Sequence, residues 1–130
     1  MIIEVVGAVI RDHDGRVLTV RKAGTGAYML PGGKREAGED DLAALARELR
    51  EELGVTLVSA TTFGRFEAAA VNEPGARVRS DVYFATVEGH MTAGAEIADL
   101  LWIDPADPPE NVAFALLLRD EVLPRLPAAS

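Results

Sequence analysis

Apolar residues recur at two different spacings along this chain, and the change in spacing separates a helix from strands. From residue 41 to residue 53 they return every three or four positions, which predicts an amphipathic helix. Asp40 is a favourable N-cap residue, and Gly54 stands where a left-handed residue often ends a helix. The stripe expected to pack on the core consists of Leu42, Leu45, Ala46, Leu49 and Leu53.

Runs rich in Ile and Val on both sides of this helix predict strands. A second helix is expected from Val112 to about Leu123, with Asn111 as its N-cap and Pro124 ending it. Strands, a helix, further strands and a final helix predict an α/β fold, with a mixed β-sheet between helices in an α/β/α sandwich. The predicted extended segments cover residues 2–11, 16–22, 28–31, 57–58, 63–66, 77–88 and 100–103, with turns at 12–15 and 72–75.

Composition narrows the classes of protein that fit. A chain of 130 residues, 48% of them hydrophobic, predicts a single globular domain over residues 1–130. There is no cysteine, which excludes disulfides, thiolate metal sites and a cysteine nucleophile. The start lacks the basic region of a signal peptide and no apolar run is long enough to cross a bilayer, so we expect a cytoplasmic protein with no membrane partner. The net charge of −8 argues against nucleic acid as a partner.

Acidic side chains gather on one arc of the central helix. Steps of 100° place Asp41, Glu48, Glu51 and Glu52 together, with Arg47 at the border. Like charges one turn apart destabilise a helix by about 0.2–0.5 kcal/mol per pair, and a divalent cation would reverse that effect because hard cations take carboxylate ligands. A solvated acidic face is the alternative reading.

The spacing of the residues before and within this acidic arc favours a cation site over a solvated acidic face. The chain reads Gly33, five residues, Glu39, seven residues, then Arg47-Glu48-Leu49-Arg50-Glu51-Glu52-Leu53-Gly54-Val55. This stretch, residues 33–55, resembles the signature of the Nudix hydrolases at every position. The resemblance implies an α/β/α sandwich and an enzyme that hydrolyses a nucleoside diphosphate linked to another group, with Mg²⁺ or Mn²⁺ as cofactor. A small-molecule nucleotide is then the expected substrate.

The resemblance also implies roles for single residues. Glu48, Glu51 and Glu52 are expected to bind the metal, together with the backbone carbonyl of Gly32. Glu39 and Arg47 are expected to hold the loop against the helix through charge-assisted hydrogen bonds, which makes Arg47 part of the catalytic apparatus. The backbone shape of the signature is expected to depend on Gly33, Gly38 and Gly54.

Further residues resemble the MutT-like branch of this family, which cleaves nucleoside triphosphates, including oxidised dGTP. Gly94-Ala95-Glu96 precedes Trp102 by the spacing typical of that branch, so Glu96 is a candidate metal ligand or general base beside Glu48, or an ordinary loop glutamate. Lys34 is either a phosphate contact or a solvated lysine. Asn111 is either a contact to a purine edge or a plain helix cap.

Arg21 and Lys22 correspond to a basic pair that lines the substrate site in the MutT-like branch. The second position carries lysine here, which lacks the bidentate geometry of a guanidinium. The pocket wall is therefore expected to differ from that branch, and the base that the site prefers is left open.

Two alternatives to a triphosphate pyrophosphohydrolase follow from the same resemblance. One is an ADP-ribose or nucleotide-sugar pyrophosphatase, although the proline typical of that group would stand near 70–72, and here Pro74 comes slightly later. The other is a nucleotide sensor without catalysis, although such domains tend to lose signature glutamates and this chain keeps all of them. Monomer and homodimer are both compatible with the sequence.

Overall fold

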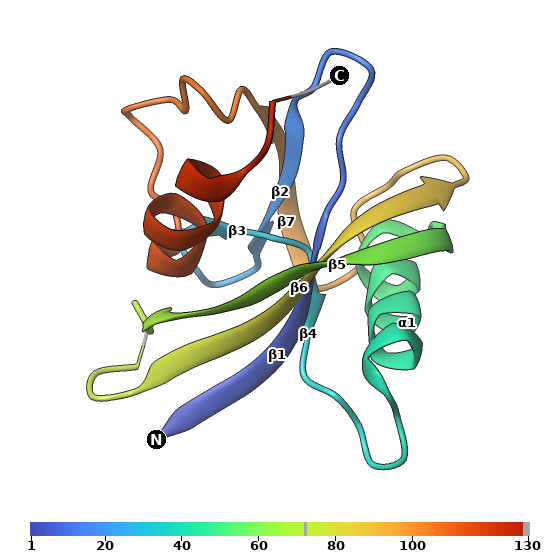
Figure 1. Cartoon of the computed structure of the whole chain (residues 1–130), viewed down its shortest axis with the longest axis horizontal. Coiled ribbons are helices and arrows are strands. Elements are labelled where there is room, and N and C mark those ends of the chain that lie inside the picture. Colours follow the sequence, from blue (N-terminus) through green and yellow to red (C-terminus); the bar gives the residue numbers. More distant parts are fainter. Residues whose placement is uncertain (72, 129–130) are drawn as a thin grey trace.

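The structure is a computed structural model that describes residues 1–71 and 73–128. The turn predicted at 72–75 includes residue 72, which lies outside the described residues. Figure 1 shows the elements in chain order. They are β1 (Ile2–Val9), β2 (Val17–Lys22), β3 (Tyr28–Met29), β4 (Gly32–Gly33), α1 (Asp41–Leu53), β5 (Thr56–Ala69), β6 (Arg77–Glu88), β7 (Ile97–Ile103), the π-helical segment η1 (Leu117–Val122) and the 3₁₀ turn η2 (Leu123–Arg125).

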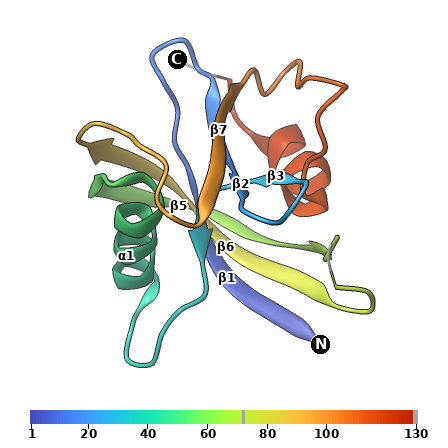
Figure 2. The same ribbon diagram turned by 180° about the vertical axis from the view of Figure 1, so that it is seen from behind.

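The strands form two sheets. The larger sheet has the order β4-β1-β6-β5, in which β1 runs parallel to β6 and the other neighbours are antiparallel. The smaller sheet has the order β3-β2-β7 and is antiparallel. Figure 2, seen from behind, shows α1 and the C-terminal helical turns on opposite sides of these strands. This mixed sheet between helices confirms the predicted α/β fold.

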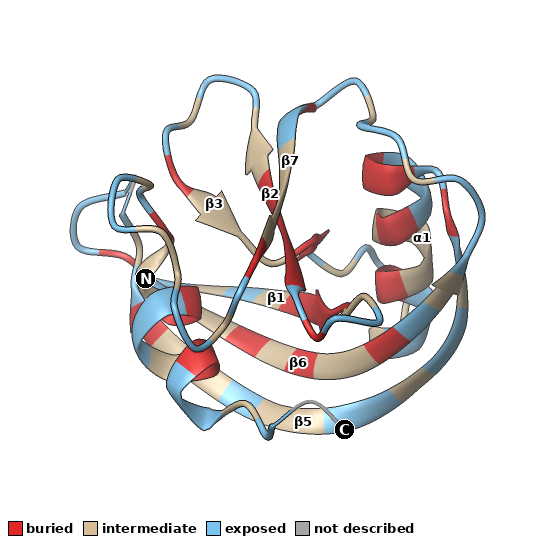
Figure 3. Cartoon of the chain, turned by 90° about the horizontal axis from the view of Figure 1, so that it is seen from above, coloured by how far each residue is buried: buried red, intermediate tan, exposed pale blue. Residues whose placement is uncertain are grey.

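Alternation along β6 explains how one strand serves two packing layers, because successive side chains point to opposite faces of a sheet. Tyr83 and Val87 pack in the hydrophobic cluster that contains the apolar side of α1. Val78 and Phe84 pack in the cluster that contains η1. In Figure 3 the buried residues of α1 and of the C-terminal turns face inward.

The central helix has the predicted bounds and caps. The Asp40 side chain accepts a hydrogen bond from the backbone N–H of Ala43, and Gly54 ends the helix with φ 69°. The prediction that Leu42 belongs to the core is wrong, since this side chain is 46% exposed. Asp41 is hydrogen-bonded to Arg35 and Tyr83, so the covered side of the first turn passes through Asp41 and Ala44 instead.

The C-terminal helix is shorter than predicted. It begins at Leu117, and Asn111 lies in an exposed turn rather than at a helix N-cap, so that assignment is wrong. The intervening segment is extended because it pairs with β3: the N–H of Tyr28 donates to the carbonyl of Ala113, and the N–H of Ala115 donates back to the carbonyl of Tyr28. These backbone bonds compete with the helix that the local sequence favours.

Two strands are longer than the sequence indicated. β5 is continuous over Thr56–Ala69 and absorbs two register shifts, where the sequence predicted two short stretches. β7 begins at Ile97, three residues before the predicted start. Within residues 1–71 and 73–128, no helix combines the length and apolar character needed to cross a bilayer.

Candidate active site

A cleft of about 480 Å³ opens beside the N-terminal half of β1 and the face of α1 that carries glutamates. β4 pairs with β1 at Val6 and Gly7, which places its two glycines next to α1. Around this point the cleft is charged, and farther along β1 its walls are mainly aliphatic, with Glu73 and Ser80 as polar exceptions. The charged part is lined by Lys22, Gly32, Gly33, Lys34, Glu48, Glu51 and Glu96, and the aliphatic part includes Ile3, Val5, Val78, Leu116 and Leu117.

Arg47 connects the acidic side chains of this site. Its guanidinium binds both carboxylate oxygens of Glu39, with Nε–Oε2 2.8 Å and Nη2–Oε1 2.9 Å. Nη1 donates to Glu48 at 2.9 Å and to Glu51 at 3.3 Å. Nη2 also donates to the backbone carbonyl of Lys34 at 2.9 Å. One guanidinium therefore fixes the loop before α1 against the helix, the role that the resemblance implied for Arg47 and Glu39.

This network shifts the acidities of the groups that form it. Hydrogen bonds from Arg47, supported by the backbone N–H of Glu36, lower the pKa of Glu39 to about 2. The same contacts with Glu39 and Glu48 raise the pKa of Arg47 above its ordinary value. Glu39 is therefore ionised at neutral pH, and its contact with Arg47 is an ion pair.

Glu52 differs from the other glutamates of α1 because it is buried, with 5% of its surface exposed. Its Oε1 accepts a hydrogen bond from the backbone N–H of Gly32 at 3.3 Å, while its buried Oε2 has no hydrogen-bond partner among the described residues. Burial, with a smaller contribution from neighbouring Glu48, raises the pKa of Glu52 to about 8. A carboxylate oxygen left without a partner in this position is suited to a cation.

Two glycines allow β4 to lie close to β1 on one side and to the carboxylate of Glu48 on the other. A Cβ on Gly32 would stand 2.0 Å from the carbonyl oxygen of Val6, and its φ of 145° is disfavoured for other residues. A Cβ on Gly33 would stand 2.6 Å from the carboxyl carbon of Glu48. Glycine is therefore needed at position 32 for space and for backbone shape, whereas a side chain at position 33 would displace the carboxylate of Glu48. Gly38, at φ 83°, lies in the turn before α1.

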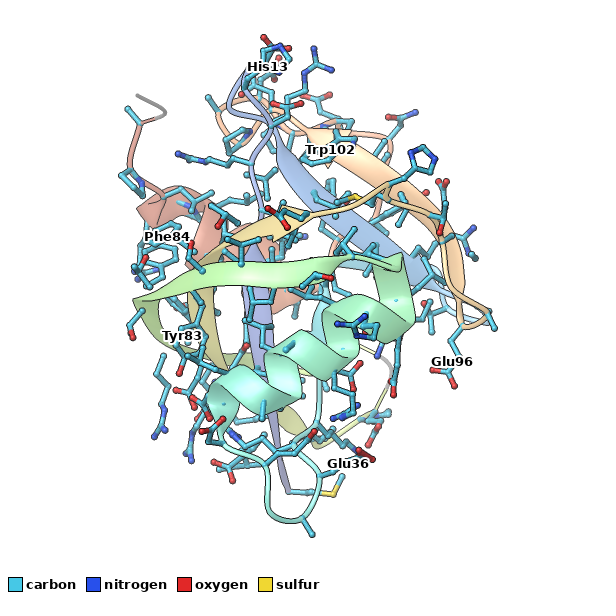
Figure 4. All side chains as sticks on the ribbon, turned by 90° about the vertical axis from the view of Figure 1, so that its right-hand side faces the viewer. His13, Glu36, Tyr83, Phe84, Glu96 and Trp102 are labelled. Atoms are coloured by element: carbon cyan, nitrogen blue, oxygen red, sulfur yellow. The ribbon has the colours of Figure 1, made fainter. Side chains whose placement is uncertain are left out.

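The segment between β6 and β7 closes the C-terminal end of α1. The backbone N–H groups of Thr92 and Gly94 donate to the carbonyls of Leu53 and Glu52 at 3.0 and 2.8 Å. Glu96 follows directly and lines the cleft, and Figure 4 shows its side chain extending outward from the chain. The loop that carries Glu96 is thus anchored to the helix that carries the other glutamates.

Gly94→Ala is expected to reduce kcat/KM by about 10- to 100-fold. The added Cβ would stand 2.1 Å from the carbonyl oxygen of Glu51, so the loop and Glu96 must move away from α1. Steady-state kinetic assays measure this loss. Gly26→Ala is the control, because an added Cβ there meets nothing within 4 Å. Equal activity of both variants would show that the position of this loop is irrelevant to turnover.

The profile of the NUDIX domain family matches residues 1–126. The chain belongs to the Nudix hydrolases. Its relatives include the CTP pyrophosphohydrolase of Escherichia coli, 34% identical over 110 residues that cover 81% of this chain and 78% of that protein. The 8-oxo-dGTP diphosphatase of Haemophilus influenzae is 40% identical over 70 residues, covering 51% of this chain and 52% of that protein.

A shorter match joins this Nudix hydrolase to the RNA pyrophosphohydrolase of Halorhodospira halophila, 52% identical over 50 residues. That match covers 38% of this chain and only 28% of the relative. Among solved structures, the MutT Nudix hydrolase from Burkholderia pseudomallei superposes with a TM-score of 0.74 at 28% identity, covering 87% of this chain and 91% of that one. These similarities place the chain among MutT-like Nudix hydrolases.

Nudix hydrolases generally use divalent metal ions, and the residues of this site fit such an ion. The carboxylates are hard oxygen donors, and the unpartnered Oε2 of Glu52 is a donor without a protein partner. In the described part of the chain, however, no three His, Cys, Asp or Glu side chains converge as a group that could hold a metal. Glu48 and Glu51 both bind Arg47 instead, so they would have to turn from the guanidinium to share an ion.

The structure brings together most of the residues singled out in the Nudix hydrolase sequence. The cleft contains both candidate lysines, Lys22 and Lys34, and the candidate base Glu96. Arg21, Glu52 and Asn111 lie outside the set of residues that line it, Glu52 being buried behind Gly32. Arg21 donates to the carbonyl of Thr25 at 3.0 Å and lies over the ring of Tyr28 at 5.8 Å.

Two features of the site were missed at the level of sequence. The helical arc placed Glu52 with its acidic neighbours, and nothing local indicated that β4 would cover it. Ser80 also lines the cleft, although every second residue around it in the sequence, Val78, Val82 and Phe84, is apolar. A polar residue among these alternating apolar positions was the feature of the sequence that could have indicated the role of Ser80.

Proposed function

We propose that the chain is a Mg²⁺- or Mn²⁺-dependent nucleoside-triphosphate pyrophosphohydrolase of MutT-like type, which releases a nucleoside monophosphate and pyrophosphate. The observation that carries this proposal is the division of one cleft into a charged part beside α1 and an aliphatic part along β1. A nucleoside triphosphate has the same division, with an anionic chain at one end and a flat, largely apolar base at the other. The names of the relatives, which act on CTP and 8-oxo-dGTP, support a substrate of this class.

The residues of the site would have separate roles in this reaction. Glu48, Glu51 and Glu52, with Glu96 and the carbonyl of Gly32, would hold the divalent ion, which supplies charge neutralisation and an activated water when bound. Lys22 and Lys34 line the cleft and would bind phosphate oxygens. Glu48 or Glu96, both in the cleft, would accept the proton of the attacking water.

Arg47 and Glu39 would act on these groups indirectly. Their bidentate pair keeps the loop that carries Lys34 against α1, since the guanidinium also binds the carbonyl of Lys34. The geometry of the charged part thus depends on a contact that does not need to touch the substrate. Arg47 is therefore a positioning residue in this proposal.

A panel of substrates with excess Mg²⁺ tests the proposed function. We expect turnover of nucleoside triphosphates to a monophosphate and pyrophosphate, identified by chromatography, and no turnover when EDTA replaces the metal. The panel includes the standard ribo- and deoxyribonucleotides, 8-oxo-dGTP, ADP-ribose and nucleotide sugars. Preference for ADP-ribose or a nucleotide sugar would contradict the triphosphate assignment. Tight nucleotide binding without hydrolysis would instead indicate a sensor.

A further inference from the structure

Three polar or charged side chains, Thr19, Glu52 and Ser80, are buried among the described residues. The hydroxyl of Thr19 donates to the carbonyl of Leu101 at 2.7 Å, and Glu52 accepts from Gly32. Ser80 is 3% exposed, yet its hydroxyl is not among the fully buried side-chain polar atoms of the described residues that lack a partner. Ser80 lines the cleft, so its hydroxyl can form a hydrogen bond with a molecule bound there.

The surroundings of Ser80 are apolar. It lies opposite Val5 in the parallel pairing of β1 with β6, and Ile3 lies opposite Val78 in the same ladder. Paired residues of parallel strands share a face, so Ser80 belongs to the aliphatic wall of the cleft. Gly7 leaves space beside it: a Cβ there would stand 3.2 Å from the Ser80 Oγ and 3.7 Å from the Leu30 side chain.

Ser80 is also displaced along β1 from the charged part of the cleft. The glycines of β4 pair with Val6 and Gly7, whereas Ser80 pairs with Val5 and the aliphatic wall continues toward Ile3. A triphosphate bound at the charged part would extend its nucleoside toward this wall. A flat base fits between aliphatic side chains, and its polar edge then needs a hydrogen-bonding group.

We propose that the hydroxyl of Ser80 forms a hydrogen bond with the edge of the substrate nucleobase and so contributes to selection among bases. This inference rests on the proposed function, since it names a specificity residue for the same cleft. A hydroxyl can donate or accept, and a site built around such a bond rejects a base that lacks the matching group because the hydroxyl is then left unpaired.

The test compares Ser80→Ala with wild type across the nucleoside triphosphates. We expect kcat/KM to fall about 3- to 30-fold for the preferred base, mainly through KM, and to change less than about twofold for the poorest base. The ratio of kcat/KM between the preferred and the poorest base is therefore expected to decrease. The thermal midpoint of the ligand-free variant is expected to equal or exceed that of wild type, because no protein hydrogen bond is lost.

Two controls separate recognition from structure. Thr19→Val removes a buried hydroxyl that is already bonded within the protein, so it should lower the thermal midpoint and leave base preference unchanged. Ser59→Ala removes an exposed hydroxyl on β5 that pairs with Thr86, and should change neither property. Ser80→Cys retains the volume with a weaker donor and should behave like the alanine variant, which provides a second reading if alanine disturbs folding.

The outcomes distinguish this inference from the proposed function. A wild-type protein that hydrolyses no nucleoside triphosphate would overturn both. A wild type that is active, with Ser80→Ala showing an unchanged order and ratio of substrates, would overturn the role of Ser80 alone. An equal loss for every base would assign the hydroxyl to the sugar or to packing and would also overturn it.

Discussion

Glu52→Gln is expected to lower metal-dependent turnover by at least about 10³-fold while leaving the fold intact. The amide keeps the size of the side chain and can retain the contact with the N–H of Gly32, but it loses the negative charge that would bind a cation. Hydrolysis assays at saturating Mg²⁺ and circular dichroism measure the two effects. Glu88→Gln, at the exposed end of β6, is the control and should keep full activity.

The same variant should be more stable than wild type in EDTA at high pH. Because the pKa of Glu52 is raised to about 8, the folded state binds more protons than the unfolded chain between about pH 4.5 and pH 8. Stability of the wild type therefore falls as pH rises through this window, and glutamine removes that fall. We expect a gain of a few degrees in the thermal midpoint at pH 9 and a smaller difference at pH 5. A difference in thermal midpoint between the variant and wild type that is the same at pH 5 and at pH 9 would contradict the burial of an ionisable group at position 52.

Arg47→Lys is expected to reduce kcat/KM by about 10²-fold despite the retained charge. A single ammonium cannot reproduce the two parallel bonds to Glu39 together with those to Glu48 and the Lys34 carbonyl. The loop before α1 should then lose its fixed position, which raises KM as well as lowering kcat. Arg50→Lys, on the exposed side of the same helix, is the matched control.

Near-normal kinetics of Arg47→Lys would show that any cation at this position suffices and that the bidentate geometry has no part in catalysis. Greater protease sensitivity of residues 34–40 in the variant than in Arg50→Lys would support the positioning role. Loss of activity without any change in that loop would assign Arg47 a direct contact with substrate.

The central helix was predictable because its signals are local. Asp40 and Gly54 define its ends, and the leucine spacing defines its inner side, all within fifteen residues. The spacing of residues gives the direction in which each side chain points around the helix axis. It does not show which of these directions are covered by other elements of the fold. That is why Leu42 was assigned to the core and why the burial of Glu52 was missed, since the cover comes from β4 and from residues such as Tyr83.

The C-terminal segment was less predictable because a distant strand decides it. Asn111 followed by apolar residues is a sound local start for a helix. In the fold, however, Phe114 pairs with Tyr28 and draws residues 112–115 into an extended form. A sequence pattern does not reveal which segment will offer free backbone groups after folding.

The candidate site also has one part that the sequence predicted and one part that only the fold revealed. Most of its charged part was predicted from the spacing of residues between Gly33 and Val55, because these residues belong to one turn and one helix that are adjacent in sequence. The aliphatic wall is assembled from β1, β6 and η1, which are far apart in sequence, so the place of Ser80 in the cleft became evident only in the fold.

The proposed reaction requires a divalent ion between the carboxylates of α1. Anomalous diffraction from crystals grown with Mn²⁺ and a non-hydrolysable nucleoside triphosphate would locate it. We expect manganese about 2.2 Å from carboxylate oxygens of Glu48 and Glu52, with the phosphates against it and Arg47 still bound to Glu39. A manganese peak elsewhere, or none, with Glu48 and Glu51 still held by Arg47, would contradict the account.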